Sequence, residues 1–254
     1  MYNNNEKSLS GLIFISIAIV LSVAIAVCGF IYSKKSVGSI ISATGSASVD
    51  FESDLIVWNG RFSAADSTSA KAYEKIKKDG EKVRKYLIDN GITEDEMIFD
   101  SVNISEDKHY NYDKNGNFLS TETVGYTLYQ SVKITSKNID KIEKVSRDIS
   151  SLLESGVEFT SNEPEYYCTT LDSVKLDLIE KATQNAKERI NIMARESGAS
   201  LSNLKSSRLG VFQITAKNSG TSSYGYDGYL DTSSREKTAS ITVKLEYGVK
   251  GSLF

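Results

Sequence analysis

The chain has 254 residues, of which 40% are hydrophobic and 25% are charged, and these are ordinary values for a globular protein. The formal net charge of −3 gives no electrostatic argument for nucleic-acid binding, which needs a basic face, so we predict no nucleic-acid partner. One proline and 17 glycines argue against a long disordered stalk and leave room for short flexible joints.

Residues 11–32 form an apolar run that contains no charged residue. As a helix that rises 1.5 Å per residue, this run would reach about 33 Å, enough for a hydrocarbon core of roughly 30 Å. It is longer than the core of a signal peptide, and Phe30 and Tyr32 make a poor exit for a signal peptidase. We therefore predict a tail over 1–10, an uncleaved transmembrane anchor over 11–32 and a linker over 33–39.

After this run, alternating apolar and polar residues predict a strand over 41–51 and a second strand over 55–64. A helix follows, from an N-cap among residues 66–68 to about Asn90, where Gly91 can end it. Steps of three and four residues predict the buried stripe of this helix: Ala70, Tyr73, Ile76, Gly80, Val83 and Leu87.

The second half of the chain continues with the same kinds of pattern. A strand near 97–104 precedes a polar and aromatic stretch over 106–123, which we expect to be an exposed hairpin or loop around Asn115-Gly116. Further patterns predict a strand over 126–134, a helix over 139–152, a strand over 157–160 and a long helix over 170–197. A strand over 204–216, a loop over 217–237 and a last strand over 239–247 follow. The predicted buried stripe of the long helix is Leu171, Val174, Leu178, Ala182, Ala186, Ile190 and Met193.

The order strand, long helix, glycine, strand, polar loop and long strand occurs over 55–136 and again over 157–247. We interpret this as an internal repeat within one α+β domain over 40–250. The predicted fold class is therefore α+β, with duplicated strand–long helix–strand units that pack helices on antiparallel or mixed sheets, preceded by one N-terminal transmembrane helix.

Several segments, in this order and spacing, resemble the SIMPL-domain family, a bacterial and archaeal group of unknown function. The resemblance covers about residues 40–247, and these segments carry it: ISATGSASV, LIDNGITEDEM, GYTLYQSVKI, LLESGVEF and LIEKATQNAKERINIMARESGASL. The resemblance implies an exported α+β domain. Some members are periplasmic or surface antigens that assemble into large rings, and some are linked to oxidative-stress defence. It implies no catalytic residues.

No set of residues in the sequence specifies a reaction, so we predict a protein that is not an enzyme, with no cofactor and no metal. His109 is the one histidine, so a histidine-based metal site or catalytic triad would rest on this single residue, and we interpret it as a solvated surface histidine. The sequence has no nucleophile elbow, phosphate-binding loop or paired C-x-x-C motif. Cys168 is a candidate free thiol, because the other cysteine, Cys28, lies in the apolar run.

Aromatic residues gather in the two polar loops among Gly, Ser and Asn, a composition typical of adaptable contact surfaces. The candidate contact residues are Tyr110, Tyr112, Phe118, Tyr224, Tyr226 and Tyr229. Since the two loops occupy corresponding places in the repeats, we expect them to project from the same end. Ordinary mobile loops are the alternative interpretation.

The expected function is that of a non-catalytic cell-envelope module that acts by self-assembly as a homo-oligomer, or by binding an envelope protein partner, with a possible link to stress defence. We expect it to be anchored in the lipid bilayer through residues 11–32. The few flanking lysines do not decide the orientation, and the family resemblance favours a C-terminal domain outside the cytoplasm. A redox-active or other enzyme and an envelope ligand-binding module remain the alternatives.

Overall fold

The computed structural model describes residues 16–30, 39–219 and 227–250. Its contacts divide the chain into two compact units, each assembled from separate segments. Unit 1 comprises Met1–Ala47, Ile179–Gly210 and Thr242–Phe254, and unit 2 comprises Ser48–Leu178 and Val211–Ile241. The predicted α+β class is confirmed, whereas the duplication over 55–136 and 157–247 stays a prediction.

The predicted transmembrane anchor is wrong. Residues 16–30, the part of the predicted run that the structure describes, form a helix. Within the described residues, no helix is both long enough and apolar enough to cross a membrane. The remainder of the predicted run, 11–15 and 31–32, lies outside the described residues. The expected cell-membrane placement and the expected contact of residues 11–32 with a bilayer are corrected with it.

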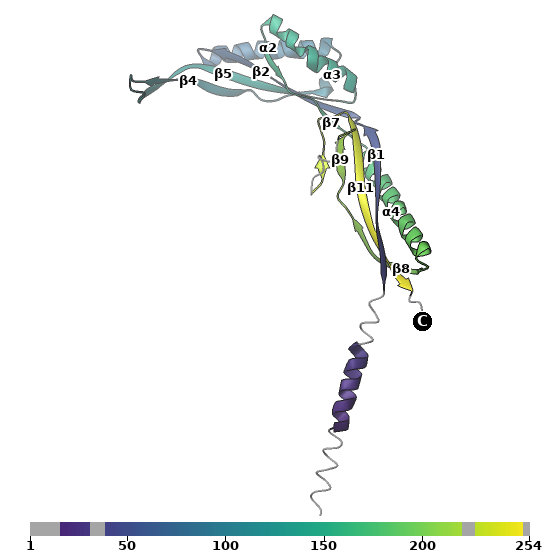
Figure 1. Ribbon diagram of the computed structural model, residues 1–254. Coiled ribbons are helices and arrows are strands. Elements are labelled where there is room, and N and C mark those ends of the chain that lie inside the picture. Colours follow the sequence, from purple (N-terminus) through teal and green to yellow (C-terminus); the bar gives the residue numbers. More distant parts are fainter. Residues whose placement is uncertain (1–15, 31–38, 220–226, 251–254) are drawn as a thin grey trace, which may run out of the picture. The chain divides into compact units, whose positions relative to one another are not determined.

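Unit 2 is built on a six-stranded antiparallel sheet (Figure 1). The strand order is β3-β5-β2-β6, with β4 also paired to β5 and β7 also paired to β2. Its strands are β2 (Leu55–Asp66), β3 (Met97–Phe99), β4 (Asn103–Tyr112), β5 (Phe118–Ser136), β6 (Glu158–Ser161) and β7 (Glu165–Tyr167). The short β7 was not predicted, and the strand expected near 97–104 is divided into β3 and β4.

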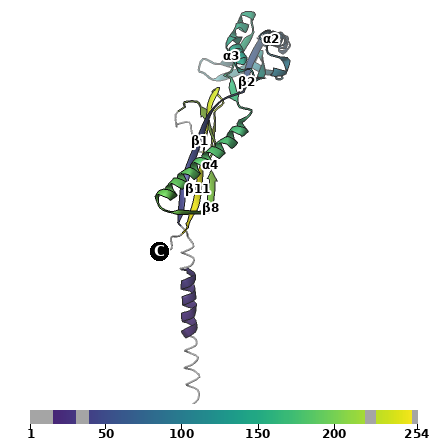
Figure 2. The ribbon, with the colours of Figure 1, turned by 90° about the vertical axis from the view of Figure 1, so that its right-hand side faces the viewer.

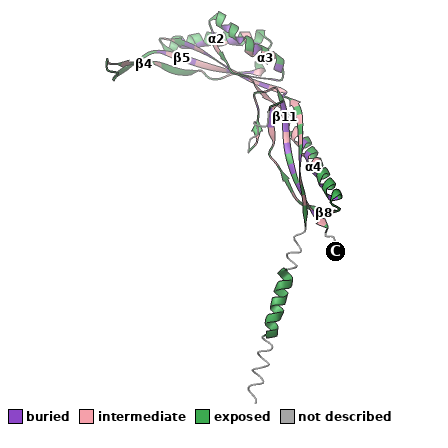
Figure 3. Cartoon of the chain, in the orientation of Figure 1, coloured by how far each residue is buried: buried purple, intermediate pink, exposed green. Residues whose placement is uncertain are grey.

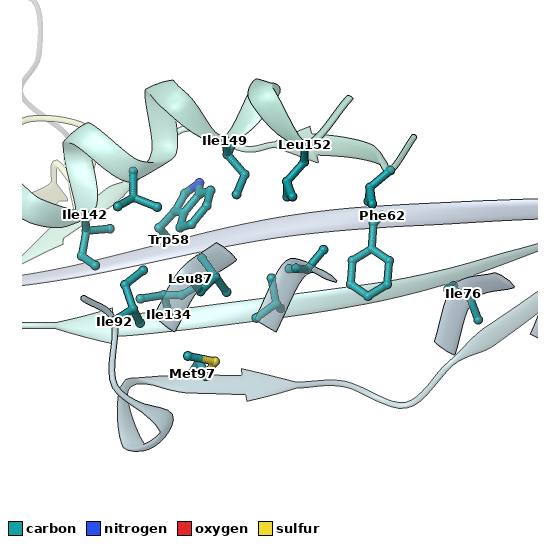
Figure 4. Close-up of a cluster of buried hydrophobic side chains, with 14 of the residues drawn as sticks. Trp58, Phe62, Ile76, Leu87, Ile92, Met97, Ile134, Ile142, Ile149 and Leu152 are labelled. Carbon is teal, nitrogen blue, oxygen red and sulfur yellow. The ribbon is translucent and has the colours of Figure 1, made fainter. Parts of the chain in front are cut away.

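One face of this sheet is covered by α2 (Ser69–Asp89) and by α3 (Ile139–Asp148), which continues into the 3-10 helix η2 (Ile149–Ser155); a further 3-10 turn, η1 (Glu94–Glu96), precedes β3. Thr68 caps α2, since its side chain accepts a hydrogen bond from the Lys71 amide. The core lies between the helices and the sheet, where the fully buried Trp58 and Phe62 of β2 are in the middle of the cluster (Figure 4).

The buried stripe of α2 differs from the predicted one in its first turns. Ala72, Ile76, Asp79, Val83 and Leu87 are buried, whereas Ala70 and Tyr73 are exposed. Both sets follow steps of three and four, so spacing alone does not separate them. Asp79 can be buried because Lys82 donates a hydrogen bond of 3.0 Å to its carboxylate.

The second sheet has five strands in the order β1-β11-β9-β10, with β8 also paired to β11. It is a mixed sheet, because β9 and β10 run parallel while β11 is antiparallel to both β8 and β9. The strands are β1 (Ile40–Glu52), β8 (Ser200–Leu209), β9 (Gln213–Ala216), β10 (Tyr229–Leu230) and β11 (Glu236–Lys250). The single strand expected over 204–216 is therefore two strands.

The helix α4 (Leu171–Glu196), which belongs to unit 1 from Ile179 onward, lies across β1 and β11 (Figure 2). The contact is close at Gly45 of β1, where an added Cβ would lie 2.3 Å from the Ala182 carbonyl oxygen and 2.3 Å from the Ala186 amide nitrogen. The two predicted alanines of the stripe thus do face the sheet. Met193, predicted on the same stripe, is instead 47% exposed, and Ala194 is buried.

Candidate functional site

The polar and aromatic stretch forms a two-stranded ribbon made of β4 and the first half of β5. The pairing of β2 with β5 ends where Asp66 lies opposite Tyr126. Over residues 118–125 of β5, β4 is therefore the only strand paired with β5 among the described residues. Almost every residue of this part of the ribbon is exposed (Figure 3). The stretch predicted to be an exposed hairpin or loop is therefore a hairpin, and its two strands extend beyond the predicted bounds of 106–123.

The turn at the tip of the ribbon is held by Asp113. Its carboxylate accepts hydrogen bonds from the backbone amides of Asn115 and Asn117, both at 2.8 Å, and from the Asn117 side chain at 2.9 Å. These bonds, led by that of the Asn117 side chain, lower the pKa of Asp113. Gly116 adopts φ = 83°, which glycine tolerates well. The ribbon is therefore closed by an ordered turn.

Three of the predicted contact residues share one face of this ribbon. Ile104 lies opposite the buried Leu128 and thus on the face that α2 covers farther along the sheet. Side chains alternate along a strand, so Tyr110 and Tyr112 lie on the same face as Ile104, and Phe118 lies opposite Tyr112. We call Ile104, Tyr110, Tyr112 and Phe118 the ribbon face.

The ribbon face is exposed, yet it is locally ordered. Its four side chains are 52–59% exposed to solvent. The rings of Tyr112 and Phe118 meet edge to face, with their centroids 6.2 Å apart. Such a pair has a preferred geometry, which limits the freedom of both rings.

At its inner end the ribbon face adjoins an open apolar groove beside the first turn of α2. The groove is lined by Ser69, Ala70, Tyr73, Val102, Ile104 and Leu128. Tyr73, whose ring was expected in the core, is 52% exposed at this groove. Tyr73, which was wrongly predicted to be buried, therefore adds to the exposed apolar surface beside the ribbon face.

A second feature, which sequence reasoning missed, is a charged cleft around Arg235. Its guanidinium binds the carboxylates of Glu52 and Asp140, and these contacts raise the pKa of Arg235. Asp54, on the wall of the cleft, accepts a hydrogen bond of 2.7 Å from the Thr169 amide. These residues lie far apart in the sequence, so no local motif could have indicated the cleft.

A comparison with protein families identifies the family of this chain. A family model described as "SIMPL: Protein of unknown function (DUF541)" matches residues 41–247. The chain belongs to the SIMPL family. A comparison with curated proteins found no match. The family description assigns no activity, so the function of this SIMPL protein has to be argued from its own residues.

The remaining predicted contact residues of this SIMPL protein do not join the ribbon face. Tyr229 is 44% exposed on β10, where it lies opposite Gln213 in the five-stranded sheet. Tyr224 and Tyr226 lie outside the described residues. The expectation that both loops project from one end stays a prediction.

The structure describes the surroundings of both Cys168 and His109 in the SIMPL domain. The Cys168 thiol is half-buried and lies 3.4 Å from the Thr170 hydroxyl, while His109 is exposed on β4 opposite Glu122. Over the residues that the structure describes, no group of three His, Cys, Asp or Glu side chains could hold a metal ion.

A buried lysine near Cys168 was also missed by sequence reasoning. Lys237 is 2% exposed, and its ammonium group donates hydrogen bonds to the carbonyl oxygens of Tyr166 and Asp231. Burial lowers the pKa of Lys237, and the nearby Asp231 opposes that effect. The lysine joins β11 to β7 and to the segment after β10, which is a structural role.

Proposed function

We propose that this SIMPL domain is a non-catalytic protein-binding module whose contact surface is the ribbon face. The surface would act either in self-association or in binding another protein. The observation that carries the proposal is the gathering of four large apolar side chains on one exposed face of an ordered ribbon.

The chemistry of the ribbon face favours a protein partner. Single exposed apolar residues are normal, but a group of them marks contact surfaces; here Tyr110, Tyr112 and Phe118 form the group, and Ile104 lies beyond Glu106 and Lys108 on the same face. Tyrosine suits such surfaces because its large ring loses little conformational freedom on binding and its hydroxyl stays hydrogen-bonded. The ordered turn at Asp113 further reduces the entropy that binding must remove.

The proposal is tested by changing the ribbon face without touching the core. In the full chain, Tyr110→Ser, Tyr112→Ser and Phe118→Ser are combined, and Leu176→Ser on α4, which removes another exposed side chain, is the matched control. We expect the triple variant to keep its far-UV circular dichroism and to lose concentration-dependent mass in light scattering, or cross-linked partners in cells. The control should keep both.

An unchanged mass distribution together with an unchanged set of cross-linked partners would refute the proposed contact surface. Because the three aromatic side chains are exposed, their removal should cost little folding stability. A loss of binding is therefore separable from a loss of structure.

A further inference from the structure

The outer edge of β4 is an open backbone edge. Within the described part of the chain, β4 pairs with β5 alone. Natural edge strands are usually blunted by charged side chains, by proline, by short length or by a bulge, and β4 carries charges at Glu106, Asp107 and Lys108 that a partner strand has to match. β4 has ten residues and no proline. The pairing of β4 with β5 has two bulges, and in both the extra residue, Val124 or Leu119, belongs to β5, so that β4 itself stays regular. The edge is therefore regular enough to accept another strand.

The sequence of β4 is complementary to itself about Asp107. In an antiparallel pair, residues directly opposite each other point to the same face of the sheet. If the two strands are identical and related by a two-fold axis perpendicular to the sheet, one residue must therefore lie opposite its own copy, with the axis between them. With the axis at Asp107, Glu106 lies opposite Lys108 of the other copy, and Ile104 lies opposite its Tyr110. Each pair occurs twice, because the interface is symmetric.

Neighbouring registers lose this match. An axis at Glu106 places Lys108 opposite Ile104, and an axis at Lys108 places Glu106 opposite Tyr110. Both put a charge against an apolar side chain. Within one copy, the Lys108 ammonium already lies 3.4 Å from the Glu106 carboxylate, and both side chains are about half exposed, at 46% and 51%. The two charges are thus available on the correct face.

We infer that β4 pairs antiparallel with β4 of a second copy of this chain, about a two-fold axis at Asp107. This inference rests on the proposed function, since it names a second copy of the chain as the protein partner and brings Ile104 and Tyr110 of the ribbon face into the contact. The pairing extends each six-stranded sheet across the axis and places the exposed Ile104 of each copy beside Tyr110 of the other.

Asp107 is the one unfavourable position in this register, because it faces its own copy across the axis. The Thr127 hydroxyl lies 2.8 and 3.0 Å from the two oxygens of the Asp107 carboxylate, so each carboxylate keeps a local hydrogen-bond donor. Two opposed carboxylates still repel each other. The register therefore predicts that Asp107→Asn strengthens the dimer.

The test is the mass of the full chain by light scattering across a concentration series at low salt. We expect a wild-type mass that rises toward twice that of one chain. Lys108→Glu or Glu106→Lys alone should raise the dissociation constant about tenfold or more, because opposite charges become like charges at two symmetric places. The double exchange Glu106→Lys/Lys108→Glu should restore it, and Asp107→Asn should lower it.

A matched control exchanges another exposed ion pair. Lys85 and Asp89 form such a pair on α2, with 2.9 Å between their charged groups. The exchange Lys85→Asp/Asp89→Lys should leave the mass unchanged. A wild-type chain that stays monomeric at every concentration, or a double exchange at β4 that does not restore dimerisation, would overturn the inference.

A disulfide measures the register independently of affinity. In a chain with Cys28→Ser and Cys168→Ser, Asp107→Cys faces itself at the Cα spacing of opposed strand residues, about 4.5–5.5 Å, which a disulfide can bridge. Oxidation should give a covalent dimer. Ser105→Cys lies opposite His109 of the other copy and should not cross-link; the reverse pattern would exclude this register.

The outcomes for the inference and for the proposed function are distinguishable. If the aromatic triple variant loses association or partners while the charge exchanges at β4 have no effect, the ribbon face binds in another way and only the β4 pairing fails. If neither set of variants has an effect, both fail.

Discussion

Replacing Gly45 with alanine would show how tightly α4 rests on β1 in unit 1. The alanine Cβ would lie 2.3 Å from the Ala182 carbonyl oxygen and from the Ala186 amide nitrogen, and 2.7 Å from the Ala186 Cα. All three atoms belong to the helix backbone, so no side-chain rotation can make room. To restore an ordinary contact of 3.4 Å, the helix would have to withdraw by about 1 Å, the difference between 3.4 and 2.3 Å.

The magnitude follows from two opposing effects. In a strand, alanine is favoured over glycine by about 0.5–1 kcal/mol, so without the helix the substitution would stabilise the protein. Overpacking costs about 1–3 kcal/mol, and here the upper end applies because backbone must move. The shift would also strain two hydrogen bonds between the elements, from Arg189 to the Thr44 carbonyl at 2.9 Å and from the Ser46 amide to Asn185 at 3.2 Å. The net loss should be about 2 kcal/mol.

Thermal unfolding followed by far-UV circular dichroism measures this loss. For a chain of this size, about 2 kcal/mol lowers the Tm by roughly 4–8 °C. Gly248→Ala in β11 is the matched control, because its Cβ would meet the Lys205 Cε at 2.9 Å, the end of a flexible side chain that can move away. The reasoning would be refuted if Gly45→Ala were as stable as Gly248→Ala, or more stable than the wild type.

Two further predictions concern charged side chains that the fold holds in place. Burial acts to raise the pKa of Glu96, but hydrogen bonds led by that from Ser136, together with Lys141 at 3.2 Å, lower it to about 2. Because the folded-state pKa lies below the ordinary value of 4.5, the stabilisation is complete above that pH and disappears as the pH falls through about 2. Glu96→Gln should therefore lower the free energy of unfolding by about 2 kcal/mol at pH 6, with the difference from wild type closing toward pH 2 in urea titrations; a constant difference would contradict this. Lys237→Met should cost about 2 kcal/mol in the same assay at pH 7, since two backbone carbonyl oxygens lose their buried donor, and an unchanged urea midpoint would show that water replaces it.

Local periodicity predicted most of the elements, and it failed where tertiary contacts choose between equal alternatives. The alternation over β1 and β2 was correct because one face of each strand is covered. The α2 stripe was partly wrong because burial of Asp79 depends on its contact with Lys82, which composition does not reveal. β7 was missed since its three residues form a strand only by pairing with β2. The anchor predicted over 11–32 rested on hydropathy alone, and no helix among the described residues is long and apolar enough to cross a membrane.

The candidate site was predictable only in part. The aromatic residues among Asn, Gly and Ser indicated Tyr110, Tyr112 and Phe118, since composition is a local property. Their common face was not predictable, because it depends on the register of β4 against β5, including the two extra residues in β5. The cleft around Arg235 joins residues from distant parts of the sequence, and no pattern within one segment could reveal it.

The division of the chain between the two units also has a consequence for biosynthesis. β1, near the start of the chain, is hydrogen-bonded to β11, which ends at Lys250. The sheet that contains β1 therefore cannot be completed until residues 236–250 have been synthesised, when residues 48–178 of unit 2 are already available. Between the synthesis of β1 and that of β11, the backbone of β1 lacks its strand partner, and an unpaired strand is prone to aggregate. The interval between the synthesis of β1 and the synthesis of β11 should therefore be the period in which this protein depends most on a chaperone.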